Sequence, residues 1–554
     1  MSAVSTSSPT NAKPAPFLTT RLFLDGAADA PSMFLLSFGY LCIFRHFATM
    51  EPDEGILLQG AERILAWQVP YRDFFSFYTP GSYYLLAALF RIFGSSIVVA
   101  RVSLAVMGAL LSSLTYLLAR RFCSRRVAAT AAAVTTLSAL PYRFVILHNW
   151  DSTLWACFAI YFAVRFLEEP RKRWSFAVGW FSALTVLFEQ SKGAGLCIGL
   201  AVAFASICLL PGGTGIITRG SVFAAISGFA VPLVSVFTYF AKRNAITIML
   251  TDWFWPLQHY STANRVPYAY QNWSDETRHL LFATGSVIER AIKWFAISPC
   301  FWIPVLPLLA VGLLGYWVAC VRRTRNTDRK KQCYIVVCGA IAGLLLSVLL
   351  SRADIIHIMY LQPLNCLVLA WCIEGRDIPV RLPRSARSIV NCFVITALVT
   401  FGMPPLFAAL SARNEVRTRR GQLTSPDKDS VVDYVQARVP ADERILVYPY
   451  LPLYYYATST LSPSQYDYFQ PGMNTPEQAN EMLRQIRSQN LKVVLFEIGF
   501  TEKIPYSWPG TPLSSLSHDP VADYIVRNYR TCTPLTSSAG WRFLFMVRKD
   551  LACR

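Results

Sequence analysis

The stretch SLAVMGALLSSLTYLLARRFCSRR, residues 103–126, places four arginines directly after a long apolar run. The run is about long enough to cross the hydrocarbon core of a bilayer, which takes roughly 20 residues of helix. Three more runs have a similar length and character: GLCIGLAVAFASICLL at 195–210, FWIPVLPLLAVGLLGYWVAC at 301–320 and CYIVVCGAIAGLLLSVLL at 333–350. These stretches predict a polytopic α-helical membrane protein.

The composition and the placement of charge support this prediction. Only 15% of the 554 residues are charged, against roughly 25% in soluble domains, and the mean hydropathy is +0.36. The net charge of +19 gathers in every second connection between apolar runs, at 120–126, 171–173, 322–331 and 376–387. Cytoplasmic loops carry this excess of Lys and Arg. We therefore exclude nucleic acid as a partner and expect a multi-pass protein of the cell (inner or plasma) membrane, in contact with membrane lipids.

Counting spans from a cytoplasmic start gives three regions. Residues 1–27 are expected to be a disordered cytoplasmic tail, and 28–410 a domain of about eleven transmembrane helices whose first external loop is 49–95. Residues 411–554 are more polar and predict a small extracytoplasmic α/β domain. We find no internal repeat and no Gly-rich phosphate loop.

Local signals define parts of the C-terminal domain. TPEQANEMLRQIRSQN is predicted to be a helix capped by Thr475, with Gln478 completing the capping box. LKVVLFEI then predicts a buried strand, and a second helix should begin after Asp519, followed by two short strands. Cys532 and Cys553 are the only cysteines of this domain, and a disulfide between them is left open because the expected compartment permits one.

The first external loop holds the most unusual residues. It begins MEPDEGILLQGAERILAWQVPYRDFFSFYTPGSYY, residues 50–84, and pairs Asp53 with Glu54. One interpretation is a helix start, because Pro52 suits the first helical position and acids stabilise the first turn. The apolar residues that follow predict an amphipathic helix lying on the bilayer. The other interpretation is catalysis, and the two are compatible because a helix start also fixes a carboxylate.

Polar residues recur in the other external turns, and ionisable residues at membrane depth are usually functional. The active side is therefore expected to be external. Simpler interpretations remain open: His148 and Asp151 could cap a span, Lys192 could extend its amine to the interface, and His357 could be a satisfied interfacial histidine. The external residues in question are Arg72, His148, Asn149, Asp151, Glu189, Lys192, Asp252, His259, Arg265, Arg352, Asp354 and His357.

Several of these motifs together resemble a known family. The acidic pair in PDEG, the segments QVPYRDFF and YTPG, the SKG turn at 191–193 and SRADIIHIMYLQP at 351–363 are similar to motifs of the GT-C membrane glycosyltransferases. The branch that looks closest is the protein mannosyltransferase and lipid A aminoarabinose transferase group. The resemblance covers roughly 30–410, and Trp67 stands where such sequences often have glycine.

The resemblance implies an inverting glycosyltransferase that takes a sugar from a polyprenyl phosphate. The acceptor would be an extracytoplasmic lipid, polysaccharide or protein. Because a phosphate leaves without a general acid, one carboxylate base is enough. By this resemblance Asp53 is the base and Glu54 supports the loop or the acceptor, whereas the cations that would hold the donor phosphate are Arg72, Lys192, Arg352 and His357.

Two questions stay open at this point. His148 and Asp151 fall where the family has a second acidic site, and with Glu54 they could ligate a divalent metal, so a metal is left open and no other cofactor is expected. A transporter or flippase for lipid-linked sugars is a rival function, but it would need paired half-repeats and charges within spans. A non-catalytic scaffold is a second rival, which leaves the clustering of acids and bases unexplained.

Overall fold

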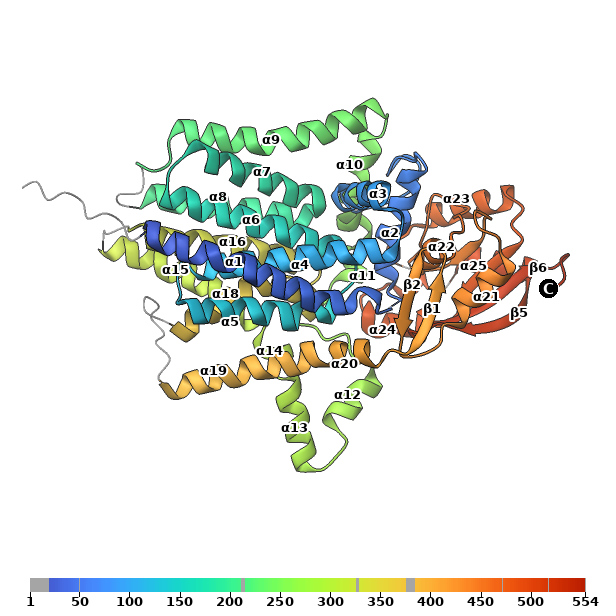
Figure 1. The fold of residues 1–554 in the computed structure, drawn as a ribbon. Helices are drawn as coiled ribbons and strands as arrows, with labels where there is room; N and C mark the ends of the chain where they lie inside the picture. Colours follow the sequence, from blue (N-terminus) through green and yellow to red (C-terminus); the bar gives the residue numbers. More distant parts are fainter. Residues whose placement is uncertain are drawn as a thin grey trace, which may run out of the picture.

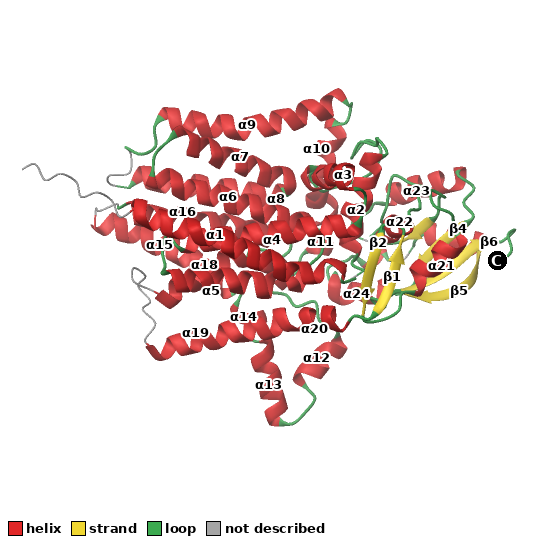
Figure 2. Cartoon of the chain, in the orientation of Figure 1, coloured by secondary structure: helices red, strands yellow, loops and turns green. Residues whose placement is uncertain are grey.

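The computed structural model describes residues 19–48, 50–210, 215–324, 328–374, 384–470, 472–516 and 518–553. Long helices run side by side through most of the molecule, and a small sheet domain sits at one end of them (Figures 1 and 2). In the described residues, six helices are long and apolar enough to cross a membrane: 97–119, 190–209, 219–242, 299–324, 329–351 and 390–411. The predicted helical, multi-span architecture is confirmed, and the count of eleven spans stays a prediction.

The bundle is held together by close helix–helix contacts. A Cβ built on Gly195 would lie 2.3 Å from the carbonyl oxygen of Gly343, so small residues allow α8 and α16 to approach closely, as is common in membranes. Part of the predicted tail, 19–27, belongs to α1, and the rest lies outside the described residues. The helices are α1 (Thr19–Leu41), α4 (Ile97–Ala119), α5 (Arg125–Val134), α6 (His148–Glu168), α7 (Lys172–Phe188), α8 (Gln190–Leu209), α9 (Arg219–Lys242), α15 (Val305–Thr324), α16 (Arg329–Ser351), α18 (Gln362–Glu374), α19 (Arg384–Ala397) and α20 (Met403–Ser411).

Basic residues gather at the end of the bundle that lies away from the sheet domain. There Arg121 pairs with Glu168 at 2.5 Å, and Arg125 pairs with Asp29 at the same distance. The opposite end carries the first loop, with α2 (Pro52–Leu65) and α3 (Gly81–Phe93), and a second loop containing α10 (Ile246–Trp255), α11 (Ser261–Asn264), α12 (Asp275–Phe282), α13 (Val287–Ile297) and α14 (Pro299–Trp302). Below, this end is called the C-terminal-domain side.

Helix α2 begins at Pro52, as predicted, but it does not lie on an open bilayer surface. Its residues from Glu54 to Ala61 are all buried, because α22 (Leu453–Thr458) of the C-terminal domain packs against it (Figure 1). A Cβ on Gly55 would lie only 2.1 Å from the backbone nitrogen of Leu453. The apolar residues of α2, which predicted a helix lying on the membrane surface, therefore pack in an interface between two parts of the chain.

The C-terminal domain contains a four-stranded mixed sheet in the order β3-β4-β6-β5, in which β3 and β4 are parallel and the other pairs antiparallel. The capping box of Thr475 and Gln478 and the helix start at Asp519 are present as predicted. Cys532 and Cys553 form a disulfide with their Cα atoms 5.6 Å apart. The elements are β3 (Leu446–Tyr448), α23 (Pro476–Ser488), β4 (Val493–Glu497), α25 (Pro520–Asn528), β5 (Tyr529–Thr536) and β6 (Arg542–Arg548).

Other elements of this domain had no clear sequence signal, and they attach it to the bundle. A hairpin of β1 (Asn414–Thr418) and β2 (Gly421–Ser425) precedes α21 (Ser430–Arg438), and α24 (Phe500–Ser507) follows β4. The backbone nitrogen of Ala48 donates to the carbonyl of Thr424 at 2.8 Å, and that of Ile97 to the carbonyl of Arg420 at 3.0 Å. The hairpin therefore extends the first loop by main-chain hydrogen bonds.

Candidate functional site

The adjacent acids Asp53 and Glu54 have different environments at the start of α2. Successive residues of a helix point about 100° apart, and here one carboxylate turns inward. Glu54 is fully buried and accepts hydrogen bonds from Arg101 Nε at 3.0 Å and Nη2 at 2.7 Å. The side chain of Asp53 keeps 32% of its surface exposed. Of the two, only Asp53 is accessible to a reactant.

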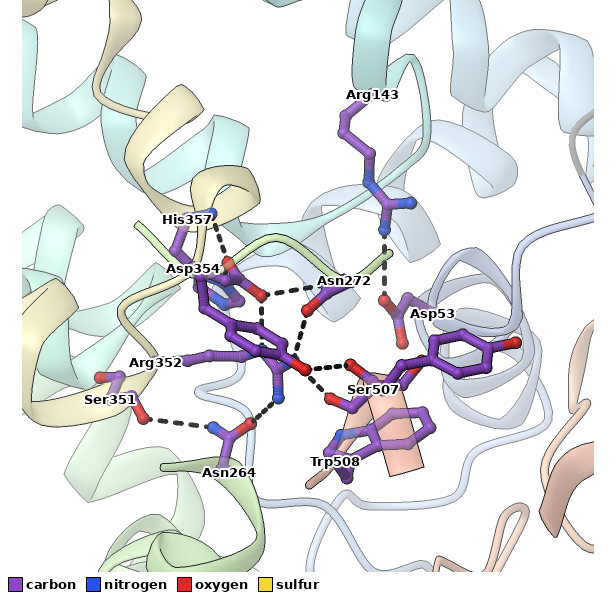
Figure 3. A network of polar contacts seen from close by, with 12 residues as sticks. Asp53, Arg143, Asn264, Asn272, Ser351, Arg352, Asp354, His357, Ser507 and Trp508 are labelled. Carbon is purple, nitrogen blue, oxygen red and sulfur yellow. Dashed lines mark hydrogen bonds and ion pairs between the residues drawn. The ribbon is translucent and has the colours of Figure 1, made fainter. Parts of the chain in front are cut away.

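Two groups contact the Asp53 carboxylate. The Tyr450 hydroxyl donates to its Oδ1 at 3.0 Å, and Arg143 Nη2 lies 3.5 Å from its Oδ2 (Figure 3). Arg143 also pairs with Glu51 at 3.1 Å. Burial and the charge of Asp53 raise the pKa of Tyr450 well above its usual range, so this phenol remains a hydrogen-bond donor at neutral pH.

Aromatic residues from the C-terminal domain and the second loop form a wall beside Asp53. The ring of Tyr450 lies 5.0 Å from that of Phe500 and 5.9 Å from that of Trp508. The Trp508 indole donates to the hydroxyl of Tyr260 at 2.7 Å. Tyrosine and tryptophan combine apolar surface with a polar end, which suits contact with a sugar ring.

A second polar cluster is centred on Asp354 (Figure 3). This buried carboxylate accepts from Arg352 Nε, from the backbone of His357 at 3.0 Å and from a ring nitrogen of His357 at 2.6 Å. Burial opposes ionisation, but His357 and Arg352 nevertheless hold the pKa of Asp354 well below its usual range. Asp354 thus orients Arg352 and His357, and the His357 side chain keeps 29% of its surface exposed.

The C-terminal domain joins these two groups. Arg352 Nη2 donates to the carbonyl of Ser507, and the next residue, Trp508, packs against Tyr450. Asn264 and Asn272 complete the hydrogen bonds of Arg352, at 3.0 and 3.1 Å. The amide of Asn272 also donates to Asp354 at 3.3 Å, so Asn272 helps to order this cluster.

Lys192 does not extend toward the membrane surface and is not free to hold a phosphate. It is 2% exposed and pairs with Glu189 at 2.9 Å. Its amine also donates to the carbonyl of Asn149 and to the hydroxyls of Ser152 and Thr153, at 2.9–3.1 Å. Lys192 therefore ties α6 to the turn between α7 and α8.

Arg72 is also placed apart from the Asp53 group. Its guanidinium pairs with Asp73 at 2.8 Å and donates to the carbonyl of Arg243 at 3.2 Å. The side chain is 39% exposed. These contacts of Arg72 hold the first loop against the end of α9. Among the described residues, Arg72 contacts neither Asp53 nor Asp354.

The residues considered for a metal are not brought together. Glu54 is taken by Arg101, Asp151 is buried and accepts from the hydroxyl of Ser82, and the His148 ring stacks on Tyr78 with centroids 4.2 Å apart. Across the described ranges, no group of three His, Cys, Asp or Glu side chains is arranged to hold a metal ion.

Three residues near Asp53 were missed by the sequence reasoning. Arg143 lies in an expected external turn, where the predicted topology disfavours arginine. This exception could have marked Arg143 as a functional residue. Glu51 stands two residues before Asp53 and was overlooked beside the acidic pair. Tyr450 belongs to the segment YPYLPLYYYATS, in which Tyr454, Tyr455 and Tyr456 are buried packing residues of α22, and no local pattern distinguishes it from them.

Comparisons with known proteins agree with the resemblance seen in the sequence. Residues 78–240 match the family model described as dolichyl-phosphate-mannose-protein mannosyltransferase. The fold is similar to that of ArnT from Cupriavidus metallidurans, crystallised with undecaprenyl phosphate, with a TM-score of 0.51, 12% identity and coverage of 96% of this chain and 99% of that chain.

A more distant likeness is to the oligosaccharyltransferase of Archaeoglobus fulgidus, crystallised with Zn and sulfate, with a TM-score of 0.47, 10% identity and coverage of 92% of this chain and 72% of that chain. No curated protein matches the sequence. The family match over residues 78–240 agrees with the resemblance to membrane glycosyltransferases, and the likeness to ArnT confirms the helical fold.

Proposed function

We propose that this membrane glycosyltransferase moves a sugar, with inversion, from a polyprenyl-phosphate donor to an acceptor on the C-terminal-domain side, with Asp53 as general base. The donor class is supported by the family match and by ArnT, whose structure was solved with undecaprenyl phosphate. The acceptor is a lipid, a polysaccharide or a protein. The alternatives of a flippase and a scaffold predict no consumption of the donor.

The assignment of Asp53 as the base rests on the different accessibility of the Asp53 and Glu54 carboxylates. Glu54 has both oxygens bound to Arg101 within a buried pair, so it cannot meet an acceptor. Asp53 is accessible, and a carboxylate with one bond from Tyr450 and a 3.5 Å contact with Arg143 still has free lone pairs. Glu51 is the remaining accessible acid, at 33% exposure, and serves as a comparison in the test.

The proposed reaction is a single displacement at the anomeric carbon. Asp53 removes the proton of the acceptor hydroxyl while its oxygen forms the new bond to that carbon. The bond between the anomeric carbon and the phosphate oxygen breaks at the same time, and the phosphate keeps the electron pair. Because the leaving group is an anion, no acid has to protonate it.

Arg352 and His357 are the cations that best suit the departing phosphate. Asp354 fixes both of them, which provides preorganised positive charge, and His357 presents the more exposed side chain. Arg143 is a positioning residue for Asp53 and Glu51. Arg352 is joined to the Asp53 group through Ser507 and Trp508, whereas the contacts of Lys192 with Glu189 and of Arg72 with Asp73 give no such link, so these two have lower priority as phosphate ligands.

The test uses purified full-length protein, a set of radiolabelled polyprenyl-phosphate sugars and an extract of source membranes as acceptor. The expected result is release of polyprenyl phosphate, with Asp53→Asn slower by about 10²–10⁴-fold, the usual worth of a positioned base. Asn is nearly isosteric with Asp, and the helix start does not depend on this side chain, because the N-cap residue is Glu51 and makes no side-chain cap. Donor that stays intact with every sugar would contradict the function.

Two comparison variants, each of which neutralises a neighbouring acid, test whether Asp53 rather than Glu51 or Glu54 is the base. Glu51→Gln should retain most of the activity. Glu54→Gln should act mainly on stability, because breaking a buried ion pair costs about 3–5 kcal/mol. Single-turnover transfer and thermal unfolding are measured for each variant, and near-normal transfer by Asp53→Asn would move the base elsewhere.

A further inference from the structure

A separate polar cleft lies between the second half of α2 and the C-terminal domain. Its volume is about 350 Å³, which is within the range of small-molecule sites, roughly 300–1,000 Å³. Figure 1 shows α2 and α22 side by side at this position. Neither the group around Asp53 nor the cluster around Asp354 lines it. The residues that line the cleft include Gln59, Gln68, Arg420, Asp442, Arg444 and Ser459.

Some charged groups at the cleft are already engaged in holding the two parts of the chain together. Arg63 pairs with Asp467 at 2.7 Å and donates to Gln68 Oε1 at 2.6 Å. Glu62 accepts from Ser95 and from Arg420 Nη2 at 2.6 Å. These contacts are structural, and they fix the walls of the cleft.

Two groups that line the cleft have no side-chain partner among the described residues. Gln59 is only 4% exposed as a residue, and its amide makes no hydrogen bond there. Arg444 is exposed on the same lining. Both can therefore bond to an occupant without giving up an existing contact.

The open groups define the chemistry of this occupant. Arg444 offers guanidinium donors, since it makes no ion pair or side-chain hydrogen bond with the residues that the structure describes, and Arg420, whose Nη2 pairs with Glu62, adds positive charge beside it. Guanidinium forks bind carboxylate and phosphate oxygens. Gln59, Gln68 and Ser459 add neutral groups, and Asp442 adds an acceptor, a combination that suits several hydroxyls around one anionic group.

We propose that this cleft binds an acidic saccharide, with its anionic group held by Arg444 and Arg420. The tyrosine rings of Tyr455 and Tyr456 line the same cleft and add apolar surface. Binding here does not depend on the proposed transfer reaction, so the two proposals can fail separately.

The experiment measures binding to purified full-length protein in detergent by calorimetry and saturation-transfer NMR. The probes are digalacturonate and glucose 6-phosphate, compared with neutral cellobiose and with inorganic phosphate alone. At least one acidic sugar should bind, more tightly than either comparison probe. Arg444→Ala should weaken this binding by about tenfold or more, since it removes a charge-assisted contact, without unfolding the protein, because Arg444 is exposed.

The matched control is Arg417→Ala, which removes an exposed arginine of β1 paired with Glu415 and outside the cleft. It should leave binding unchanged, and Asp53→Asn should also still bind the probe. The proposal is overturned if neither acidic sugar binds, if Arg444→Ala binds like the wild type, if cellobiose binds equally well, or if phosphate alone matches glucose 6-phosphate.

Discussion

The Tyr450 hydroxyl donates a 3.0 Å hydrogen bond to Asp53, although 397 positions separate the two residues. Asp53 lies at the start of α2 in the first loop, and Tyr450 lies in the C-terminal domain between β3 and α22. The proposed base is therefore oriented by a part of the chain that the family match, residues 78–240, does not cover.

Replacing Tyr450 by phenylalanine removes this bond and keeps the ring. A hydrogen bond to a charged group contributes about 1.5–3 kcal/mol, so the turnover rate should fall roughly 10- to 100-fold, with a smaller effect on donor KM. Tyr468→Phe is the matched control, because the buried Tyr468 hydroxyl has no partner in the described ranges. Equal kinetics for the two variants would mean that Tyr450 only packs.

His357→Ala should weaken use of the donor, because it removes the more exposed side chain of the Asp354 cluster. Loss of a preorganised hydrogen-bond donor at the leaving group costs roughly 2–4 kcal/mol of transition-state stabilisation, which is measured as the change in kcat/KM. Arg72→Ala, which removes a cation engaged elsewhere, should stay close to the wild type. If Arg72→Ala proves the more damaging change, the phosphate site has been assigned to the wrong loop.

Gly55→Ala should loosen the C-terminal domain from α2. The added Cβ would lie 2.1 Å from the Leu453 nitrogen, and overpacking of this kind costs about 1–3 kcal/mol. We expect a lower unfolding temperature, faster proteolysis after 411 and reduced turnover, because Tyr450 shifts away from Asp53. Gly39→Ala is the control, since nothing lies within 4 Å of its added Cβ; similar behaviour of both variants would argue against tight docking.

Glu497 predicts a pH dependence of stability. Burial raises the pKa of this β4 carboxyl to about 7, although Lys503 of α24 and Arg542 of β6 act in the opposite direction. A raised folded-state pKa means that the folded protein binds the proton more tightly than the unfolded chain. Stability should therefore fall between about pH 4.5 and pH 7, by an amount on the order of 3 kcal/mol.

The variant Glu497→Gln isolates this effect. It keeps an oxygen to accept from the backbone of Gly499, as Glu497 does at 2.7 Å, but it cannot ionise. Thermal unfolding at pH 5 and pH 8 should show wild type and variant alike at the lower pH, and the variant more stable at the higher. A wild-type protein that is equally stable at both values would show that the carboxyl ionises freely.

The features that could be predicted from sequence depend on short-range patterns. Apolar length identifies the spans, and capping chemistry identifies the helix starts at Pro52, Thr475 and Asp519, because each is decided within a few residues. The separation of Asp53 from Glu54 also followed from helical geometry. Arg101, the partner that buries Glu54, lies on α4, and no local signal links the two.

Long-range contacts account for what the sequence did not reveal. Lys192 looked accessible at a turn, but its environment is set by α6, which supplies Asn149, Ser152 and Thr153. Tyr450 and Tyr454 have similar sequence surroundings, yet only packing decides that Tyr450 reaches Asp53 and that Tyr454 is buried in the core. The roles of such residues depend on how the two parts of the chain dock.

The hairpin that bonds to Ala48 and Ile97 has a consequence for the order in which the protein is made. The ribosome completes the first loop and every span before it reaches β1, so a growing chain can insert in the bilayer while Asp53 still lacks its partner from residue 450. If Asp53 is the base, we expect transfer to begin only after the last domain has been synthesised and has folded back onto the first loop. A chain released early would then sit in the membrane without Tyr450 beside Asp53, so completion of translation would itself set the start of activity.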